Sequence, residues 1–217
     1  MAPKMSKLQR FNLMLLEWWS PDQFDYQWRK TSDPYKILIS ELLLHKTDAK
    51  KVEQVYPKFI EKFPTILDLY RADIKEIEKL IKDIGLFYRA KRIKKIAEQI
   101  INQFNGNIPD SKKGLVSLYG VVDYISNAVL CFAFKKRVPI VDTNVIRVYE
   151  RVFNLKSSKS RPRTDKKIWN FAEKVLPSEK YVEYNYALLD FGSEICRARN
   201  PFCNICEAKA ICARVVR

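Results

Sequence analysis

Residues 118–147 read LYGVVDYISNAVLCFAFKKRVPIVDTNVIR, and the rest of the chain makes most sense as their support. The stretch holds a short turn at Gly120, an apolar helical segment, and a lone carboxylate, Asp142, after a Val-Pro-Ile-Val run. Backbone amides at the start of a helix favour anions, so the turn predicts phosphate binding. A carboxylate that directly follows an apolar segment suits a catalytic role. The stretch therefore predicts a phosphate-binding turn followed by a reactive carboxylate.

The chain of 217 residues carries 40 Lys and Arg against 25 Asp and Glu, a net charge of +15. Such an excess indicates a polyanionic partner, because cations that neutralise phosphates release condensed counterions. A merely soluble basic protein, or a charged thermophile surface, is the alternative. Nucleic acid is favoured over both, since 15 uncompensated charges repel one another in the folded state.

No apolar run approaches the length of a membrane span, and the basic N-terminal segment lacks a small-residue cleavage site. The sequence therefore predicts an intracellular protein without a membrane partner, cytoplasmic and nucleoid-associated if the source is prokaryotic. Disulfides are unfavourable in that compartment, so the five cysteines need another explanation.

Apolar residues recur at helical spacing along most of the chain, and period-2 alternation is rare. With 47% hydrophobic residues, the chain can bury the core of one domain or of two lobes. We expect an all-α protein. Helices are expected at residues 8–18, after the pairs 33–34, 47–48, 64–65 and 72–73, over 90–104, on either side of residue 120, after 143, from about 166, and over 181–195.

Four of the cysteines follow a C-x6-C-x2-C-x5-C pattern near the C-terminus: Cys196, Cys203, Cys206 and Cys212. Four thiolates in one short segment can surround a single metal centre, either zinc or an iron–sulfur cluster. Only one C-x-x-C pair is present, whereas structural zinc sites more often use two. The fifth, Cys131, lies in an apolar helical segment and is expected to be a small core residue.

This cysteine spacing resembles the iron–sulfur loop of the endonuclease III family, the helix–hairpin–helix Gly/Pro–Asp DNA glycosylases. Further landmarks of the family occur here in the same order, so the resemblance extends over roughly residues 10–212. The segments that carry it are WRKTSDPYKILISELLLHKT at 28–47, DIGLFYRAKRIKKIA at 83–97, LYGVVDYISNAVLCFAF at 118–134 and VDTNVIRV at 141–148. The ordered set is much more specific than any one piece.

The resemblance implies two helical lobes, a six-helix lobe over 26–136 and a cluster lobe that combines 1–25 with 137–217. It also implies that the four cysteines hold a [4Fe–4S] cluster with a mainly structural role. The loop between the first two cysteines would then bring Arg197 and Arg199 near DNA phosphates.

Asp142 matches the catalytic aspartate of the family, which stabilises the cationic sugar formed as a base leaves. Its alternative role is an N-cap before Thr143, and the two roles are compatible. Glu41 lies among aliphatic residues, which would raise the pKa of its carboxyl and suit a general acid. The alternative for Glu41 is a position on a solvated helix face. It matches a glutamate of adenine glycosylases that thymine mismatch glycosylases also carry.

Tyr124 occupies the position at which bifunctional members carry a Schiff-base lysine. Tyrosine cannot form an imine, so we expect a monofunctional glycosylase that leaves an abasic site. The alternative role for Tyr124 is packing in the helix that follows the turn. Tyrosine occurs at this position in thymine mismatch glycosylases and in some adenine glycosylases.

The resemblance also suggests DNA-contacting residues. Leu86 would enter the space left by the flipped base, with a core leucine as the alternative. Trp28 and Tyr26 would line the base pocket, with Trp28 preferred for stacking; packing between lobes is the alternative. His45 and Lys46 would contact the opposite strand, and a basic residue there resembles the thymine mismatch type. An exposed helix end is the alternative for His45.

Two residues of the turn depart from the family's L-P-G-V-G pattern, because Tyr119 replaces the proline and Val122 replaces the second glycine. Valine disfavours positive φ and adds bulk. The turn, which includes Gly120, is therefore expected to contact DNA less closely than the corresponding turn in the family.

These observations favour a monomeric, monofunctional DNA glycosylase that excises thymine or uracil opposite guanine in double-stranded DNA. The family branch is that of the thymine mismatch and adenine glycosylases. One alternative is a minimal adenine glycosylase acting opposite guanine or 8-oxoguanine. The alternative from another class is an inactive DNA-binding relative, which would not need both Asp142 and Glu41.

Overall fold

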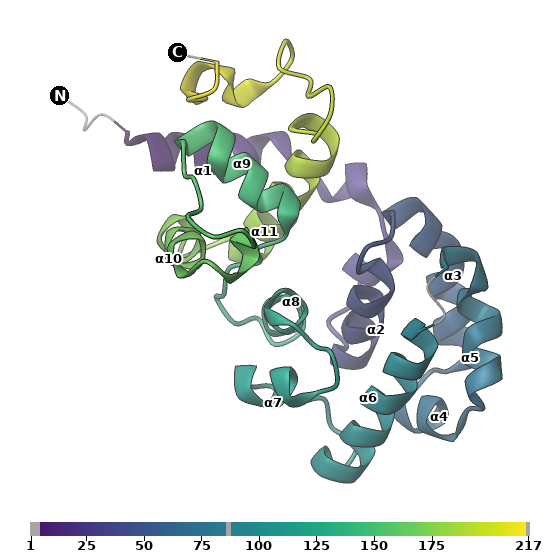
Figure 1. Ribbon diagram of the computed structural model, residues 1–217. Helices are drawn as coiled ribbons and strands as arrows, with labels where there is room; N and C mark the ends of the chain where they lie inside the picture. The colour runs from purple at the N-terminus through teal and green to yellow at the C-terminus, as the bar shows by residue number, and fades with distance from the viewer. Residues whose placement is uncertain (1–4, 86–87, 216–217) are drawn as a thin grey trace. The chain divides into compact units, whose positions relative to one another are not determined.

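The computed structural model describes residues 5–85 and 88–215, and all regular secondary structure within them is helical (Figure 1). The expected all-α class is confirmed. The chain divides into two compact units, one of Met1–Phe24 with Arg137–Arg217 and one of Asp25–Lys136. None of the described helices is long and apolar enough to cross a lipid bilayer.

In the described part of the continuous unit, residues 25–85 and 88–136, the chain forms seven α-helices. They are α2 (Pro34–Leu44), α3 (Ala49–Lys62), α4 (Ile66–Arg71), α5 (Ile74–Ile81), α6 (Tyr88–Phe104), α7 (Lys112–Ser117) and α8 (Asp123–Phe132), with short 3₁₀ turns at Gln27–Arg29 and Lys82–Ile84. Four predicted starts are confirmed by a capping side chain, because Asp33, Asp48, Thr65 and Asp73 all accept backbone N–H groups of the first turn.

Helix α2 lies at the centre of this unit, in contact with α3, α6 and α8 (Figure 1). Every residue from Ile37 to Leu43 is buried, so α2 has no solvated face over this length. A helix that is apolar on all sides is stable only inside a core. This arrangement fixes the backbone that carries Glu41.

The discontinuous unit contains α1 (Lys7–Trp18), α9 (Thr143–Phe153), α10 (Lys166–Val175) and α11 (Tyr181–Asp190). It also has 3₁₀ turns at Pro21–Phe24, Pro162–Thr164 and Glu207–Ile211. Helix α1 packs against α11 and against the 3₁₀ turn of the cysteine segment. Its buried residues Phe11 and Leu15 share one core with Val145, Tyr149 and Phe191.

The helix expected over 181–195 changes character at Phe191, where five residues, Phe191–Ile195, form a π-helical turn. A β-carbon at Gly192 would lie only 2.8 Å from the β-carbon of Asn144. The turn therefore lets the chain approach the start of α9 at a residue without a side chain. Single π turns of this kind occur frequently at functional sites.

Candidate active site

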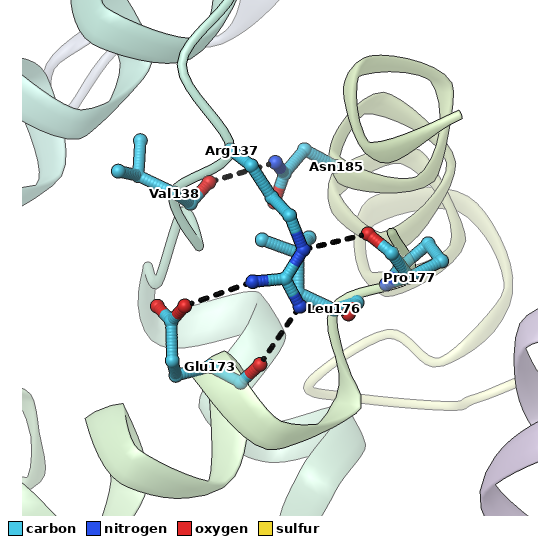
Figure 2. Close-up of polar contacts among 6 residues, drawn as sticks. All are labelled: Arg137, Val138, Glu173, Leu176, Pro177 and Asn185. Atoms are coloured by element: carbon cyan, nitrogen blue, oxygen red, sulfur yellow. Dashed lines mark hydrogen bonds and ion pairs between the residues drawn. The ribbon is translucent and has the colours of Figure 1, made fainter. Parts of the chain in front are cut away.

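The chain reaches Asp142 through a segment without regular secondary structure that begins at Arg137 and is held by contacts with α10, the loop after it and α11 (Figure 2). The Arg137 guanidinium donates to the carbonyls of Pro177 and Leu176 and forms an ion pair with Glu173 at 3.0 Å. These acceptors lie at the end of α10 and in the loop after it. The start of the segment is therefore attached to a second element of the same unit.

Asn185 of α11 fixes the middle of the segment. Its amide nitrogen donates to the carbonyl of Val138 at 3.1 Å (Figure 2). Its side-chain oxygen accepts the N–H of Ile140 at 3.1 Å. Asn185 is buried and so replaces the water that these backbone groups would otherwise bind. The position of Asp142, two residues further on, follows from this restraint.

Asp142 is the N-cap of α9, as its alternative role predicted. One carboxylate oxygen accepts the N–H of Val145 at 2.7 Å, and the other accepts the side-chain amide of Asn144 at 2.9 Å. Burial raises the pKa of Asp142 above its ordinary value, while these two donors and the nearby Arg147 oppose the rise. The carboxylate is thus both oriented and partly desolvated.

Asn144 is itself oriented by Arg147, one turn along α9. The Arg147 guanidinium donates to the side-chain oxygen of Asn144 at 2.8 Å, to the carbonyl of Gly192 at 2.6 Å and to the carbonyl of Cys196 at 2.7 Å. A continuous set of hydrogen bonds therefore runs from the start of the cysteine segment to Asp142. Sequence reasoning quoted VDTNVIRV as a motif but assigned no role to Asn144 or Arg147.

The four predicted cluster cysteines line one pocket of the discontinuous unit: Cys196, Cys203, Cys206 and Cys212. Arg151 of α9 holds the first of them, donating to the carbonyls of Cys196 at 3.2 Å and Arg197 at 2.6 Å. Within residues 5–85 and 88–215, no group of three or more His, Cys, Asp or Glu side chains is arranged to hold a metal ion. Cys131 is fully buried in α8, as expected of a core residue.

The loop after Cys196 exposes both of its arginines, Arg197 and Arg199. The Arg197 guanidinium lies 4.5 Å from the ring centroid of Phe202 and donates to the carbonyl of Glu194. Both cations are accessible to a polyanion. Their contact with DNA stays a prediction.

Glu41 is 3% exposed and lies on the central helix α2. The alternative of a solvated helix face is therefore wrong, because α2 has none at this position. Tyr124 lies in the first turn of α8 and is half-buried. The catalytic roles of both residues stay predictions.

The turn before α8 corrects one expectation. Val122 has φ of −102° and ψ of 169°, an extended backbone that any residue adopts, so valine is not strained there. Gly120 has φ of +71°, the left-handed region in which a side chain costs about 1–2 kcal/mol. Glycine is thus required at position 120 and not at position 122. The bulk of Val122 remains, since its side chain is 44% exposed.

A buried arginine that the sequence reasoning missed holds the turn after α2. Arg89 is 1% exposed, and its guanidinium donates to the carbonyls of Leu43 and His45 at 2.9 and 2.7 Å and to the Thr47 hydroxyl at 2.9 Å. The turn includes Lys46, whose φ is +62°. Arg89 therefore fixes the segment on which His45 and Lys46 are predicted to contact DNA.

We expect Arg89→Met to lower the free energy of unfolding by about 3 kcal/mol, because one buried and two part-buried acceptors lose their donor. Denaturant unfolding of both proteins measures this difference. The matched control is Lys91→Met, an exposed cation of the same helix, for which a change within about 0.5 kcal/mol is expected. Equal effects of the two substitutions would show that the hydrogen bonds of Arg89 contribute nothing.

Trp28 and Tyr26 stack with ring centroids 4.6 Å apart and planes 6° apart. Trp28 is 4% exposed and meets the edge of Tyr56, so it packs inside the continuous unit. Tyr26 is the more accessible of the two rings and carries the Arg29 guanidinium 5.2 Å from its centroid. A base-stacking role suits Tyr26 better than Trp28, and the role itself stays a prediction. Leu86 lies outside the described residues.

In this helical chain, a glycine turn leads into α8 and a carboxylate caps α9. The family model described as HhH-GPD superfamily base excision DNA repair protein matches residues 39–174. A thymine/uracil-DNA glycosylase of Pyrobaculum aerophilum is 37% identical over 98% of this chain and 94% of its own length. The chain belongs to the HhH-GPD superfamily of base excision DNA repair proteins.

Two solved structures extend the comparison. A thermostable thymine-DNA glycosylase superimposes with a TM-score of 0.90, at 37% identity over 97% of each chain. Endonuclease III, trapped in a covalent intermediate with DNA, superimposes with a TM-score of 0.81, at 25% identity over 98% of each chain. The protein thus shares the fold of both solved proteins.

Proposed function

We propose that the protein is a monofunctional DNA glycosylase that removes thymine or uracil opposite guanine and leaves an abasic site. The oriented and partly desolvated carboxylate of Asp142 is the observation that carries this proposal. The substrate class is supported by the 37% identical thymine/uracil-DNA glycosylase, which is similar over nearly the full length of both chains. We further propose that the protein acts as a monomer.

Asp142 would act on the sugar of a nucleotide taken out of the stack, an extrusion that costs a few kcal/mol. Breaking the bond between sugar and base leaves positive charge on the sugar, and a nearby carboxylate stabilises that charge. Two donors, Val145 and Asn144, fix both oxygens before substrate arrives. Stabilisation that is present in advance requires no reorganisation as the charge develops.

Glu41 would protonate the departing base. The Glu41 side chain is buried on a helix without a solvated face at this position, and burial disfavours the ionised form of a carboxyl, which suits a general acid. This proposal extends the first one, which would still stand if Glu41 proved not to be the acid.

The test is a panel of duplexes that contain T·G, U·G, A·G and A·8-oxoguanine pairs, each incubated with the protein and then treated with alkali or left untreated. We expect strand breaks for T·G and U·G only after alkali, because the product is an abasic site. Cutting confined to the two adenine duplexes would identify an adenine glycosylase. Binding of all four duplexes without product would identify an inactive relative.

Tyr124 is proposed to prevent strand cleavage, because a phenol cannot form the imine that a lysine forms with the sugar. We expect Tyr124→Lys to yield alkali-independent strand breaks and a product that borohydride traps covalently on the protein. Tyr124→Phe is the matched control and should give neither. Alkali-independent cleavage by the unsubstituted protein would contradict this role.

The four cysteines are proposed to hold a [4Fe–4S] cluster, for which the shared pocket and the all-thiol donor set are the support. Bound there, the cluster would crosslink the C-terminal segment. We expect protein isolated without oxygen to absorb broadly near the blue end of the visible range, as an iron–sulfur protein does. Cys203→Ser should remove the absorbance and Cys131→Ser should retain it. A colourless protein that contains zinc would overturn the assignment.

The remaining DNA contacts are proposed for several parts of the chain. Exposed cations of the cysteine loop would bind phosphates, the turn after α2 would contact the opposite strand, and Gly120 would let the DNA backbone approach the turn before α8. Val122 would limit that approach. Leu86 would fill the gap left by the flipped base, and Tyr26 with Trp28 would line its pocket. The proposed phosphate ligands are Arg197 and Arg199, and the proposed contacts to the opposite strand are His45 and Lys46.

A further inference from the structure

Helix α6 contacts the turn before α8 through a glutamine. The N–H of Tyr119 donates to the side-chain oxygen of Gln99 at 2.6 Å, and the Gln99 amide nitrogen donates to the carbonyl of Ser117 at 3.3 Å. One side chain thus satisfies a donor and an acceptor of the turn. The donor exists only because residue 119 is not proline, which has no N–H.

Two cations of the same helix contact the same turn. Arg92 is 7% exposed and donates to the carbonyl of Gly120 at 2.5 Å. A β-carbon at Gly120 would lie 3.0 Å from its Nε atom, so the turn rests directly on this side chain. The Lys95 ammonium lies 4.1 Å from the ring centroid of Tyr119. Residues 92, 95 and 99 are three and four positions apart, which places them on one face of α6.

We propose that Arg92, Lys95 and Gln99 position the turn at residues 117–122 for a DNA phosphate, with Gln99 supplying the restraint that proline would supply at position 119. The inference rests on the proposed function, since it assumes that the turn contacts DNA. Proline restrains a turn by fixing φ, whereas the hydrogen bond of Gln99 fixes the direction of an N–H group. Both reduce the number of conformations that must be lost on binding.

A double-mutant cycle tests the proposal with four proteins: the unsubstituted protein, Gln99→Ala, Tyr119→Pro and the double variant. A hydrogen bond of ordinary strength predicts that Gln99→Ala alone raises KM for a T·G duplex by about threefold to tenfold, with kcat unchanged at saturation. In the Tyr119→Pro background the same substitution should change KM by less than about twofold, because its partner N–H is already absent.

The matched control is Gln103→Ala, an exposed glutamine one turn further along α6, which should leave KM unchanged. Equal effects of Gln99→Ala in the two backgrounds would overturn the proposal, because Gln99 would then act through another contact. A fall in kcat at saturating duplex would overturn it as well, since a positioning role at the phosphate changes binding and not the chemical step.

Hydrogen exchange of the peptide that spans residues 117–122 separates this inference from the proposed function. Gln99→Ala should accelerate exchange there when Tyr119 is present and have no effect in the Tyr119→Pro background. Failure of the unsubstituted protein to release any base would refute the proposed function, and the exchange result would still decide the inference. Unchanged exchange in both backgrounds would refute it.

Discussion

Asp142→Asn is expected to reduce the rate of base release by about 10³-fold, which is the loss typical when one preorganised electrostatic group is removed. Asparagine has the same shape but no charge, so it cannot stabilise a cationic sugar. It is as good an N-cap as aspartate, and only the hydrogen bond from Asn144 is lost, because an amide NH2 group cannot accept it. The free energy of unfolding should therefore change by no more than about 1 kcal/mol.

Single-turnover cleavage of a T·G duplex and thermal unfolding measure the two effects. The matched control is Asp73→Asn, which makes the same change of residue at the N-cap of α5 and should leave the rate unchanged. If Asp142→Asn instead kept the full rate, Asp142 would be a cap and nothing more.

The pH dependence of the same reaction gives an independent check. Burial raises the pKa of Asp142, and the stabilising form is the ionised one. The rate should therefore fall on the acid side at a higher pH than an exposed aspartate would give. The acid limb should disappear from the residual activity of Asp142→Asn. An acid limb that persists in that variant would belong to another group.

Helix starts could be predicted from the sequence because they depend on neighbours a few residues away. The pair Asp33 and Pro34 is one example, and Thr65 with Asp68, which form a reciprocal capping box, is another. Tertiary contacts could not be predicted in this way. Arg89 and Arg92 lie in a basic run that resembles a solvated helix face, and their burial depends on carbonyls 28 to 46 residues away.

In the candidate site, too, local features could be predicted from the sequence and tertiary contacts could not. Asp142 was found from its place in a motif, and its capping role from the residue that follows it. Its orientation also depends on Asn185 and, through Asn144 and Arg147, on the carbonyls of Gly192 and Cys196. The positive φ assumed at position 122 was wrong because it was inferred from a glycine in the family pattern, while in this turn Gly120 has positive φ and Val122 is extended.

Glu41→Gln is expected to slow base release by about 10² to 10⁴-fold, the usual contribution of a general acid. Glutamine has nearly the same volume, so α2 should keep its packing. A buried amide is also less costly than a buried carboxylate when that group ionises. We therefore expect the melting temperature to stay equal or rise, which is the opposite of what a structural role for the carboxylate predicts.

The contrast with Ser40 makes this result interpretable. Ser40 is the preceding buried polar residue of α2, and its hydroxyl donates to the carbonyl of Ile37 at 2.8 Å. Ser40→Ala should leave the rate of base release unchanged and alter only stability, by about 1 kcal/mol. A core polar group and a catalytic acid on the same helix thus give opposite patterns of rate and stability. If Glu41→Gln melted lower at an unchanged rate, Glu41 would be a structural group, and Asp142 alone would remain as the proposed catalytic carboxylate.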